Sequence, residues 1–435
     1  MSFAVRFLNM KLPTLLILAA LFMSPGAHAE PAPANHDESK VPAYTLPDPL
    51  RASDGSIITN AAGWPKRRAE ILELFRTHVY GHRPAPPVQM KFELTSRATN
   101  ALGGLATRKE YNVRLGTGSN APSLNVLLYV PNGATKRVPA ILGMNFSGNH
   151  AIHTDPGITL SDRWVRESKG GCVTNNRATD ACRGKEAGQW AVEKILRRGY
   201  AVATVYCGDI EPDFPEGWQL GVRAALHPAG TNANFKPDDW AAISAWAWGL
   251  SRALDCLERD ADVDGKRVAV FGHSRLGKTA VWAGAQDERF AMVLSNESGE
   301  GGAALARRFY GETTAIIQQK FPHWFCSNFR KYADNESALP VDQHELLALV
   351  APRPLYVASA AEDRWSDPRG EFLSARAADP VYALFGKAGL GVAEMPGTNQ
   401  PAGDVIRYHI RSGRHDVTEF DWDQYLDFAD RHLQR

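Results

Sequence analysis

The sequence predicts an α/β fold in which a mostly parallel central sheet is sandwiched between layers of helices. Short apolar segments recur along the chain with helical patterns between them, as expected for strands that are buried on both faces. The 435 residues are 44% hydrophobic with a formal net charge of +1, which excludes a disordered chain. Because 49 basic residues are balanced by 48 acidic ones, we expect no nucleic-acid partner.

The expected strands and helices alternate in the order that a parallel sheet requires. A helix-like stretch at 188–198 precedes a strand at 200–206, and a long helix at 240–258 precedes a strand at 267–271. An amphipathic helix is expected at 421–433. Ligands of such sheets bind beyond the carboxyl ends of the strands, so functional residues should follow them directly. The expected strands are 124–130, 138–144, 200–206, 267–271, 290–295 and 354–358.

The first 29 residues have the pattern of a secretory signal peptide. A positively charged start leads into an apolar run at 12–23, and small residues that suit cleavage after Ala29 follow it. This run is shorter than the roughly 20 residues that a bilayer-spanning helix needs. We therefore expect an exported protein, secreted or periplasmic, that has no membrane association once the leader is removed.

The rest of the chain indicates a single catalytic domain. Residues 30–50 are rich in Pro, Ala and charge, and they predict a poorly ordered lead-in or a wrapping arm. From 51 to 435 no linker is long enough to separate two domains, and α/β enzymes with insertions reach this length. We expect one domain at 51–435 and a monomer.

Five cysteines fit an exported protein, and their odd number leaves at least one without an intrachain partner. Cys172 and Cys182 bracket a polar loop and are the favoured pair in an oxidising compartment. Cys256 lies in a helical stretch and is expected in the core. The pairing of Cys207 and Cys326 stays open. No spacing indicates a metal site.

A serine follows the strand at 267–271 on what is expected to be a tight turn. Gly272 and Ser274 match a nucleophile elbow, in which Ser lies between a strand and a helix. The last Gly of this motif is displaced by one position, because Leu276 stands where Gly is usual and Gly277 follows. The N–H of Arg275 can then face an oxyanion at the start of the helix. A serine that merely caps the helix is the alternative.

A nucleophilic serine needs a histidine base that an acid orients. His415 lies in a loop just before the closing helix, where this fold class carries its base. His409 lies in a strand-like run and is interpreted as structural, and His432 lies in the closing helix.

Two acids compete for the third role. Glu297 follows the strand after the nucleophile, and Asp363 follows the next expected strand. Spacing alone does not choose between them. Either acid could instead pair with Arg275, Arg364 or Arg369.

Five motifs together resemble the glucuronoyl esterases, carbohydrate esterase family 15, in their bacterial form. The resemblance extends over about residues 40–435 and implies an α/β-hydrolase fold and a serine esterase without cofactor. The motifs are GHSRLGK at 272–278, NESGEGGAA at 296–304, HWF at 323–325, EDRWSDP at 362–368 and GRHDVTEFDW at 413–422.

The resemblance implies a role for each matching residue. Ser274 would be the nucleophile and His415 the general base. Glu297 matches the family's acid, and Asp363 matches a second acid position that many bacterial members have. Arg275 would stabilise the oxyanion through its backbone and its guanidinium, which stays charged.

Three further residues are implied to contact the sugar. Lys278, one helical turn after the nucleophile, would bind hydroxyl groups, and Glu312 and Trp365 would line the glucuronate site. Alternatively, Lys278 is a solvated helix residue and Trp365 a packing residue. His323 and Trp324 are interpreted as core and are left out of the catalytic set.

The sequence also departs from the fungal members of this family. They have cysteines at the positions of His273, Leu305 and Asp416, so their disulfides are not kept and give no support to the bridge expected above. The segment 153–189 resembles an extra loop of bacterial members and is expected to flank the substrate cleft.

The favoured hypothesis is therefore a secreted or periplasmic serine esterase. It would cleave the ester between a (4-O-methyl-)glucuronoyl group of xylan and a lignin alcohol, through an acyl-enzyme on Ser274. One alternative is an exported acetylxylan or short-chain acyl esterase of the same fold, although an acetyl group offers nothing for Arg275 and Lys278 to bind. A non-catalytic carbohydrate-binding protein is the alternative from another class.

Overall fold

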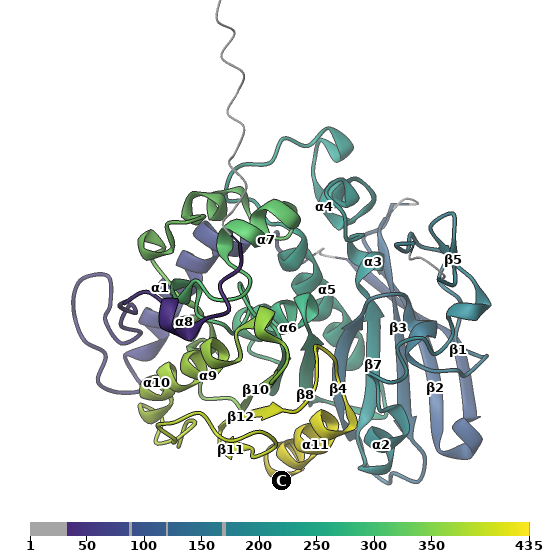
Figure 1. Ribbon diagram of the computed structural model, residues 1–435. Coiled ribbons are helices and arrows are strands. Elements are labelled where there is room, and N and C mark those ends of the chain that lie inside the picture. Colours follow the sequence, from purple (N-terminus) through teal and green to yellow (C-terminus); the bar gives the residue numbers. More distant parts are fainter. Residues whose placement is uncertain (1–32, 87–88, 119–120, 168–170, 435) are drawn as a thin grey trace, which may run out of the picture. The chain divides into compact units, whose positions relative to one another are not determined.

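The computed structural model describes residues 33–86, 89–118, 121–167 and 171–434, and within them ten strands form one large sheet (Figure 1). The strands from β7 to β12 in the order below are parallel, and β1 to β3 and β11 add antiparallel strands at the two edges. In sheet order the strands are β1 (Met90–Ala101), β2 (Ala106–Leu115), β3 (Ser123–Pro131), β7 (Ala201–Tyr206), β4 (Val138–Asn145), β8 (Val263–His273), β9 (Met292–Asn296), β10 (Leu355–Ala360), β12 (Ile406–Arg411) and β11 (Ala402–Gly403).

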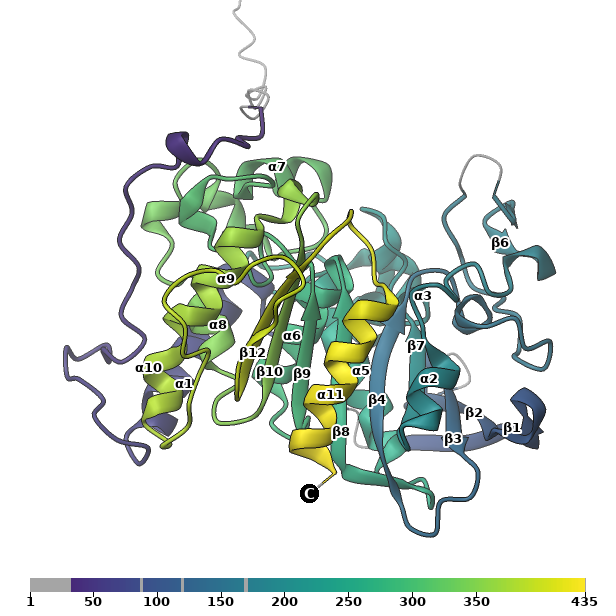
Figure 2. The same ribbon diagram turned by 60° about the horizontal axis from the view of Figure 1, so that its bottom comes forward.

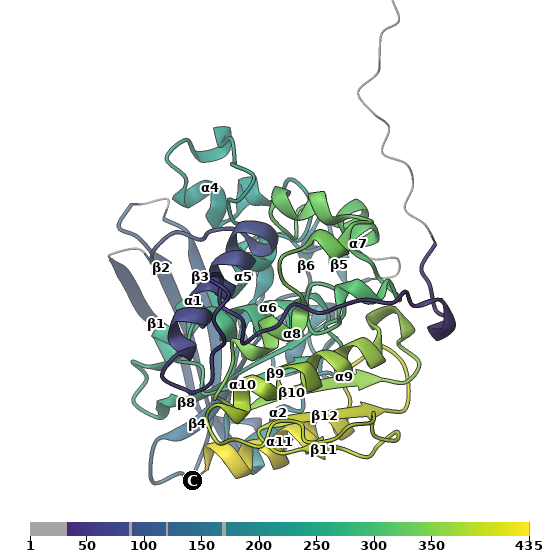
Figure 3. The same ribbon diagram turned by 90° about the vertical axis from the view of Figure 1, so that its left-hand side faces the viewer.

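Helices cover both faces of this sheet because its strands are apolar on both sides. Along β3, Val126 and Leu128 pack into one core, and Leu127 and Tyr129 pack into the other. The second core is closed by α2 (Val192–Arg197) and α11 (Glu419–Leu433), which lie on the same face in Figure 2. The first core is closed by α1 (Trp64–Phe75), α5 (Ala242–Leu257), α6 (Arg275–Gln286), α8 (Gln343–Ala348), α9 (Pro368–Ala377) and α10 (Asp379–Ala383), several of which face the viewer in Figure 3.

The expected fold class is confirmed, with local differences at the ends of elements. Every expected strand is present, and the strand expected at 267–271 extends as β8 from Val263 to His273. The helix expected at 188–198 begins only at Val192, because Gly188 and Gln189 lie in turns. The antiparallel pair β1 and β2 was not expected, since β1 is polar and largely exposed.

The described part of the lead-in, residues 33–50, contacts the body of the protein. The carbonyl of Asn35 accepts from the N–H of Gly311 at 2.7 Å, and Glu38 pairs with Arg308 at 2.7 Å. The expected leader at 1–29 lies outside the described residues, and the division into leader, lead-in and catalytic domain stays a prediction. No helix in the described ranges has the length and apolarity needed to cross a membrane.

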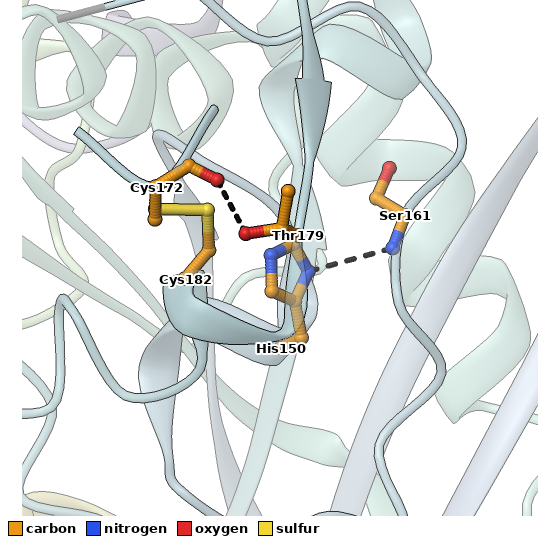
Figure 4. Close-up of a disulfide and its surroundings, with 5 residues drawn as sticks. All are labelled: His150, Ser161, Cys172, Thr179 and Cys182. Carbon is orange, nitrogen blue, oxygen red and sulfur yellow. Dashed lines mark hydrogen bonds between the residues drawn. A yellow bond between two sulfur atoms is a disulfide. The ribbon is translucent and has the colours of Figure 1, made fainter. Parts of the chain in front are cut away.

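The loop expected at 153–189 carries the disulfide that the sequence favoured. Cys172 and Cys182 are bonded, and the hydroxyl of Thr179 donates to the carbonyl of Cys172 at 2.6 Å (Figure 4). In the same view, the backbone N–H of Ser161 points toward His150. The loop contains the short strands β5 (Val173–Thr174) and β6 (Arg177–Ala178). Cys207, Cys256 and Cys326 are free and buried, so the core position expected for Cys256 is confirmed.

The strand register brings the functional candidates to one edge of the sheet. His273 at the end of β8 lies beside Asn296 at the end of β9, and Ala360 of β10 lies beside Arg411 of β12. The candidate nucleophile, acids and base follow these strand ends within four residues, so they converge although they are far apart in sequence.

Further short helices lie in the connections. They include α3 (Cys207–Ile210), α4 (Val222–Leu226), α7 (Thr314–Lys320) and the single turns η4 (Asn149–Ile152) and η11 (Arg364–Ser366).

Candidate active site

Ser274 occupies a strained turn between β8 and α6. Its φ of 57° lies in the left-handed region, and its backbone N–H donates to the carbonyl of Asn296 at 3.0 Å. A Cβ on Gly272 would lie 1.9 Å from the carbonyl oxygen of Leu276, so only Gly fits there. The side chain of Leu276 is buried in the core, and Gly277 packs against the carbonyl of Asn296. The displaced glycine is therefore where this turn needs a small residue.

His415 is held by two carboxylates through the same ring nitrogen. Its Nδ1 lies 2.7 Å from Oδ2 of Asp363 and 3.0 Å from Oε2 of Glu297. Both acids are buried, whereas the side chain of His415 is 38% exposed. With Nδ1 engaged by the acids, Nε2 is the nitrogen that remains for proton transfer.

Glu297 is fixed by a second charged partner that the sequence did not suggest. Arg411 donates to Oε1 of Glu297 at 2.6 Å and pairs with Asp421 at 2.8 Å. The backbone N–H of Asp416 donates to the other oxygen of Glu297 at 3.1 Å. The backbone of Glu297 is itself strained, with a φ of 46°. These contacts give the acid one fixed orientation toward His415.

The two acids differ in their electrostatics. Burial raises the pKa of Glu297 to about 7, although His415 and Arg411 partly oppose this. Burial also acts on Asp363, but the hydrogen bond and charge of His415 outweigh it and lower the pKa of that carboxyl. Asp363 thus holds its negative charge more firmly at neutral pH.

The same contacts predict a displaced acid limb in the pH dependence of activity. Burial alone would lower the pKa of His415, but the hydrogen bonds and charges of Asp363 and Glu297 raise it to about 9. A base must be neutral to accept a proton, so kcat/KM should rise with pH and reach half its maximum well above pH 6.5, the ordinary value for histidine. Asp363→Asn removes one carboxylate and should move this limb to lower pH.

A pH profile with a neutral ester substrate checks this expectation, with non-enzymatic hydrolysis subtracted at each pH. A wild-type midpoint at or below pH 6.5 would contradict it, as would a limb that Asp363→Asn leaves in place.

Arg275 is oriented by the buried carboxylate of Asp213. Its Nε lies 2.8 Å from Oδ2 of Asp213, and Oδ1 of Asp213 accepts from His323 at 2.8 Å and from Trp324 at 2.7 Å. The guanidinium carbon lies 4.5 Å from the centre of the Phe146 ring. His323 and Trp324 are buried, as interpreted from the sequence, but they also fix the partner of Arg275.

Among the described residues, neither acid forms an ion pair with Arg275, Arg364 or Arg369, the alternatives that the sequence left open. Arg275 pairs instead with Asp213, and Arg369 pairs with Glu38. Glu297 pairs with Arg411. Arg364 donates to the hydroxyl of Tyr310.

Lys278 and Glu312 form a buried pair next to the turn. Nζ of Lys278 lies 3.3 Å from Oε2 of Glu312 and donates to the carbonyl of Ser298 at 2.7 Å. Only 4% of Lys278 is exposed, so the alternative of a solvated helix residue is wrong. The backbone of Trp365 accepts from the N–H of Glu312 at 2.9 Å, and its half-buried ring lies 4.3 Å from Nζ of Lys320. The structure thus brings all three candidates for sugar binding to one region.

His273 lies beside His415 as a neutral ring, with the two ring planes tilted by 38°. Its Nδ1 donates to Oδ1 of Asn296 at 2.7 Å, and its ring centre lies 4.5 Å from that of His415. Burial and the neighbouring His415 lower the pKa of His273 to about 3. In the described ranges, His273, Glu297 and His415 form the one group of three with potential metal-ligand atoms within 4.8 Å. Hydrogen bonds to neighbouring residues already engage all three.

Three residues that support the site were missed by the sequence interpretation. Arg411 ends a buried strand, and Asp213 lies shortly after the end of another. A charged residue in either place is a signal that could have found them. Glu371 accepts a hydrogen bond from the N–H of Gly299, two residues after Glu297, at 2.9 Å. It lies within a helix, and nothing in its sequence context distinguishes it.

The strand order, the strained turn at Ser274 and the acid-bound His415 define the class of the protein. It is an α/β-hydrolase. The chain is 51% identical to the glucuronoyl esterase of Solibacter usitatus, with 91% of this chain and 99% of that one covered and a TM-score of 0.86. It is 49% identical to a promiscuous CE15 esterase from a marine bacterial metagenome, with 92% and 100% covered and a TM-score of 0.86. The chain belongs to carbohydrate esterase family 15, the glucuronoyl esterases.

Two further comparisons agree with this assignment. The family model described as "Glucuronyl esterase, fungi" matches residues 235–386, a range that contains the turn at Ser274 and both acids. The 4-O-methyl-glucuronoyl methylesterase 1 of Wolfiporia cocos is 29% identical over 388 residues, 86% of this chain and 80% of that protein.

Proposed function

We propose that the protein is a serine esterase that hydrolyses esters of (4-O-methyl-)glucuronic acid. These include the esters that join glucuronoxylan to lignin alcohols. The observation that carries this proposal is the contact of His415 with Asp363 and Glu297 beside the strained turn of Ser274. The names of the relatives, a glucuronoyl esterase and a 4-O-methyl-glucuronoyl methylesterase, support the substrate class.

The proposed mechanism uses an acyl-enzyme. The hydroxyl oxygen of Ser274 attacks the ester carbonyl while His415 takes its proton, and the C–O bond to the alcohol breaks as His415 returns that proton to the leaving oxygen. A water, deprotonated by His415, then attacks the acyl-enzyme and releases the uronic acid. Arg275 stabilises the oxyanion with its backbone N–H at the first position of α6 and with its guanidinium.

The proposed sugar-binding residues are Lys278, Glu312 and Trp365. The first two are buried and paired, so they offer rigid polar groups to hydroxyls, and the indole of Trp365 offers a flat apolar face. We also propose that the leader at 1–29 directs export, because a polymeric plant cell wall cannot enter a cell. The exported protein is proposed to be a monomer.

A kinetic comparison tests the substrate class. Methyl, allyl and benzyl glucuronate should be hydrolysed with higher kcat/KM than the matched galacturonate esters, whose 4-hydroxyl points the other way. Acetylated xylan should be a poor substrate, because acetyl offers no group for Lys278 or Glu312. Faster release of acetate than of benzyl alcohol would favour the acetyl esterase, and binding of uronate oligosaccharides without turnover would favour the binding protein.

A further inference from the structure

A cleft of about 410 Å³, lined mostly by polar residues, lies at the same edge of the sheet as Ser274. Asn112 of β2 and Asn125 of β3 are paired in register, and β3 runs antiparallel to β7, so this end of both strands lies at the carboxyl end of β7. Asn149 of η4, Leu160 in the loop after it and Asp209 of α3 also line the cleft. In Figure 1 the region around β2, β3 and the β5 loop lies beyond β7 from the catalytic strands.

The cleft adjoins the surroundings of Arg275 through two loops. Phe146 packs on the guanidinium of Arg275, and Asn149, three residues later, lines the cleft. Asp213 pairs with Arg275, and Asp209, four residues earlier, lines the cleft. Segments of three and four residues extend at most roughly 11 and 14 Å. A polymer anchored at Ser274 by one sugar therefore has the cleft within reach of its neighbouring sugars.

The polar groups of the cleft are held in place before any ligand binds. The amide of Asn112 donates to Oδ1 of Asn125 at 3.0 Å, and the amide of Asn125 donates to Asp209 at 3.2 Å. The amide of Asn149 donates to the carbonyl of Asn125 at 2.8 Å. Rigid amide and carboxylate groups that keep further hydrogen-bonding capacity suit the hydroxyls of a sugar.

The charge and shape of the lining select among ligands. The lining has three acidic residues and one basic residue, so a uronate or another anion is disfavoured. The acidic residues are Glu110, Asp162 and Asp209, and the basic residue is Arg163. Tyr206 is the one aromatic side chain among the lining residues, which disfavours a lignin-like alcohol. These acids are also not among the described groups of three whose ligand atoms lie close enough for a metal ion.

We propose that this cleft binds neutral sugar residues of the polysaccharide that carries the uronate ester. The volume falls within the range of about 300–1,000 Å³ that is usual for ligand sites. The inference rests on the proposed function, because it assigns to the same enzyme a second region that holds the polymer and not the acyl group.

Two substitutions test the cleft without touching the catalytic residues. Asn112→Ala removes hydrogen-bonding groups, and Leu160→Trp fills space at a partly buried position. Asn234→Ala, in a different cleft beside α4, is the matched control. Benzyl glucuronate and a glucuronoyl ester borne on a xylo-oligosaccharide serve as substrates, and neutral xylotetraose serves as the binding probe. Thermal unfolding checks that each variant is folded.

The proposal predicts a lower KM for the oligosaccharide ester than for benzyl glucuronate in the wild type. Each cleft variant should raise that KM about tenfold and weaken xylotetraose binding. For Asn112→Ala, this change is the equivalent of one or two lost hydrogen bonds. The cleft variants should keep wild-type activity on benzyl glucuronate, and the control variant Asn234→Ala should keep wild-type activity on both esters. Equal KM values for the two esters in the wild type would overturn the cleft proposal. So would xylotetraose binding that is unchanged in both folded cleft variants, or preferential binding of oligogalacturonate. An enzyme inactive on benzyl glucuronate would instead contradict the proposed function.

Discussion

Ser274→Ala is expected to lower kcat for benzyl glucuronate by about 10⁴-fold or more, because it removes the proposed nucleophile of the acyl-enzyme. The substitution removes one oxygen from a half-buried side chain and keeps the backbone of the turn, so the folded structure should persist. Initial rates with a chromogenic or chromatographically resolved alcohol measure the effect.

Ser412→Ala is the matched control, since Ser412 is exposed and lies in the loop of His415. Full activity of a folded Ser274→Ala variant would exclude the proposed mechanism, and a comparable loss in Ser412→Ala would show that the assay reports on the loop.

The second large effect concerns the two acids. Glu297→Gln is expected to lower kcat by about 10²–10³-fold and Asp363→Asn by about tenfold. Glu297 orients His415 and also neutralises Arg411, both within a buried network, whereas Asp363 is bound to His415 without a second ion-pair partner among the described residues. Glu297→Gln should also lower the free energy of unfolding by about 2–3 kcal/mol, because the buried Arg411 loses one of its two carboxylate partners.

Kinetics and chemical denaturation of both variants test this ranking, with Glu362→Gln as control at an exposed neighbouring carboxylate. A larger kcat loss for Asp363→Asn would reverse the assignment. Equal, mild losses would mean that the two acids share the role.

Most of the parallel sheet could be predicted because its strands are buried on both faces and stand out as apolar runs. The strand at 124–130 is recognisable for this reason, and β1 is not, because its side chains alternate on a largely exposed surface. The helix α2 begins later than the sequence predicts, since an apolar periodicity does not reveal the turns at Gly188 and Gln189.

The sequence indicated the proposed reacting groups better than the residues that hold them in place. Ser274, Glu297, Asp363 and His415 follow strand ends, which is a local signal, and the structure brings them together. Arg411 is 114 residues from Glu297 in sequence, and the Asp213 pair with Arg275 also depends on the folded sheet. A charged residue near the end of a buried strand is a signal in the sequence, but its partner is not, because only the strand order determines which charges meet.

The most direct test of the central claim is to trap the acyl-enzyme. Wild-type protein mixed with excess benzyl glucuronate and quenched in acid within the first turnovers is digested and examined by mass spectrometry. The account predicts a glucuronoyl group on the peptide that contains Ser274, and its absence from Ser274→Ala. Rapid hydrolysis with Ser274 unmodified, or a glucuronoyl group attached to another residue, would contradict it.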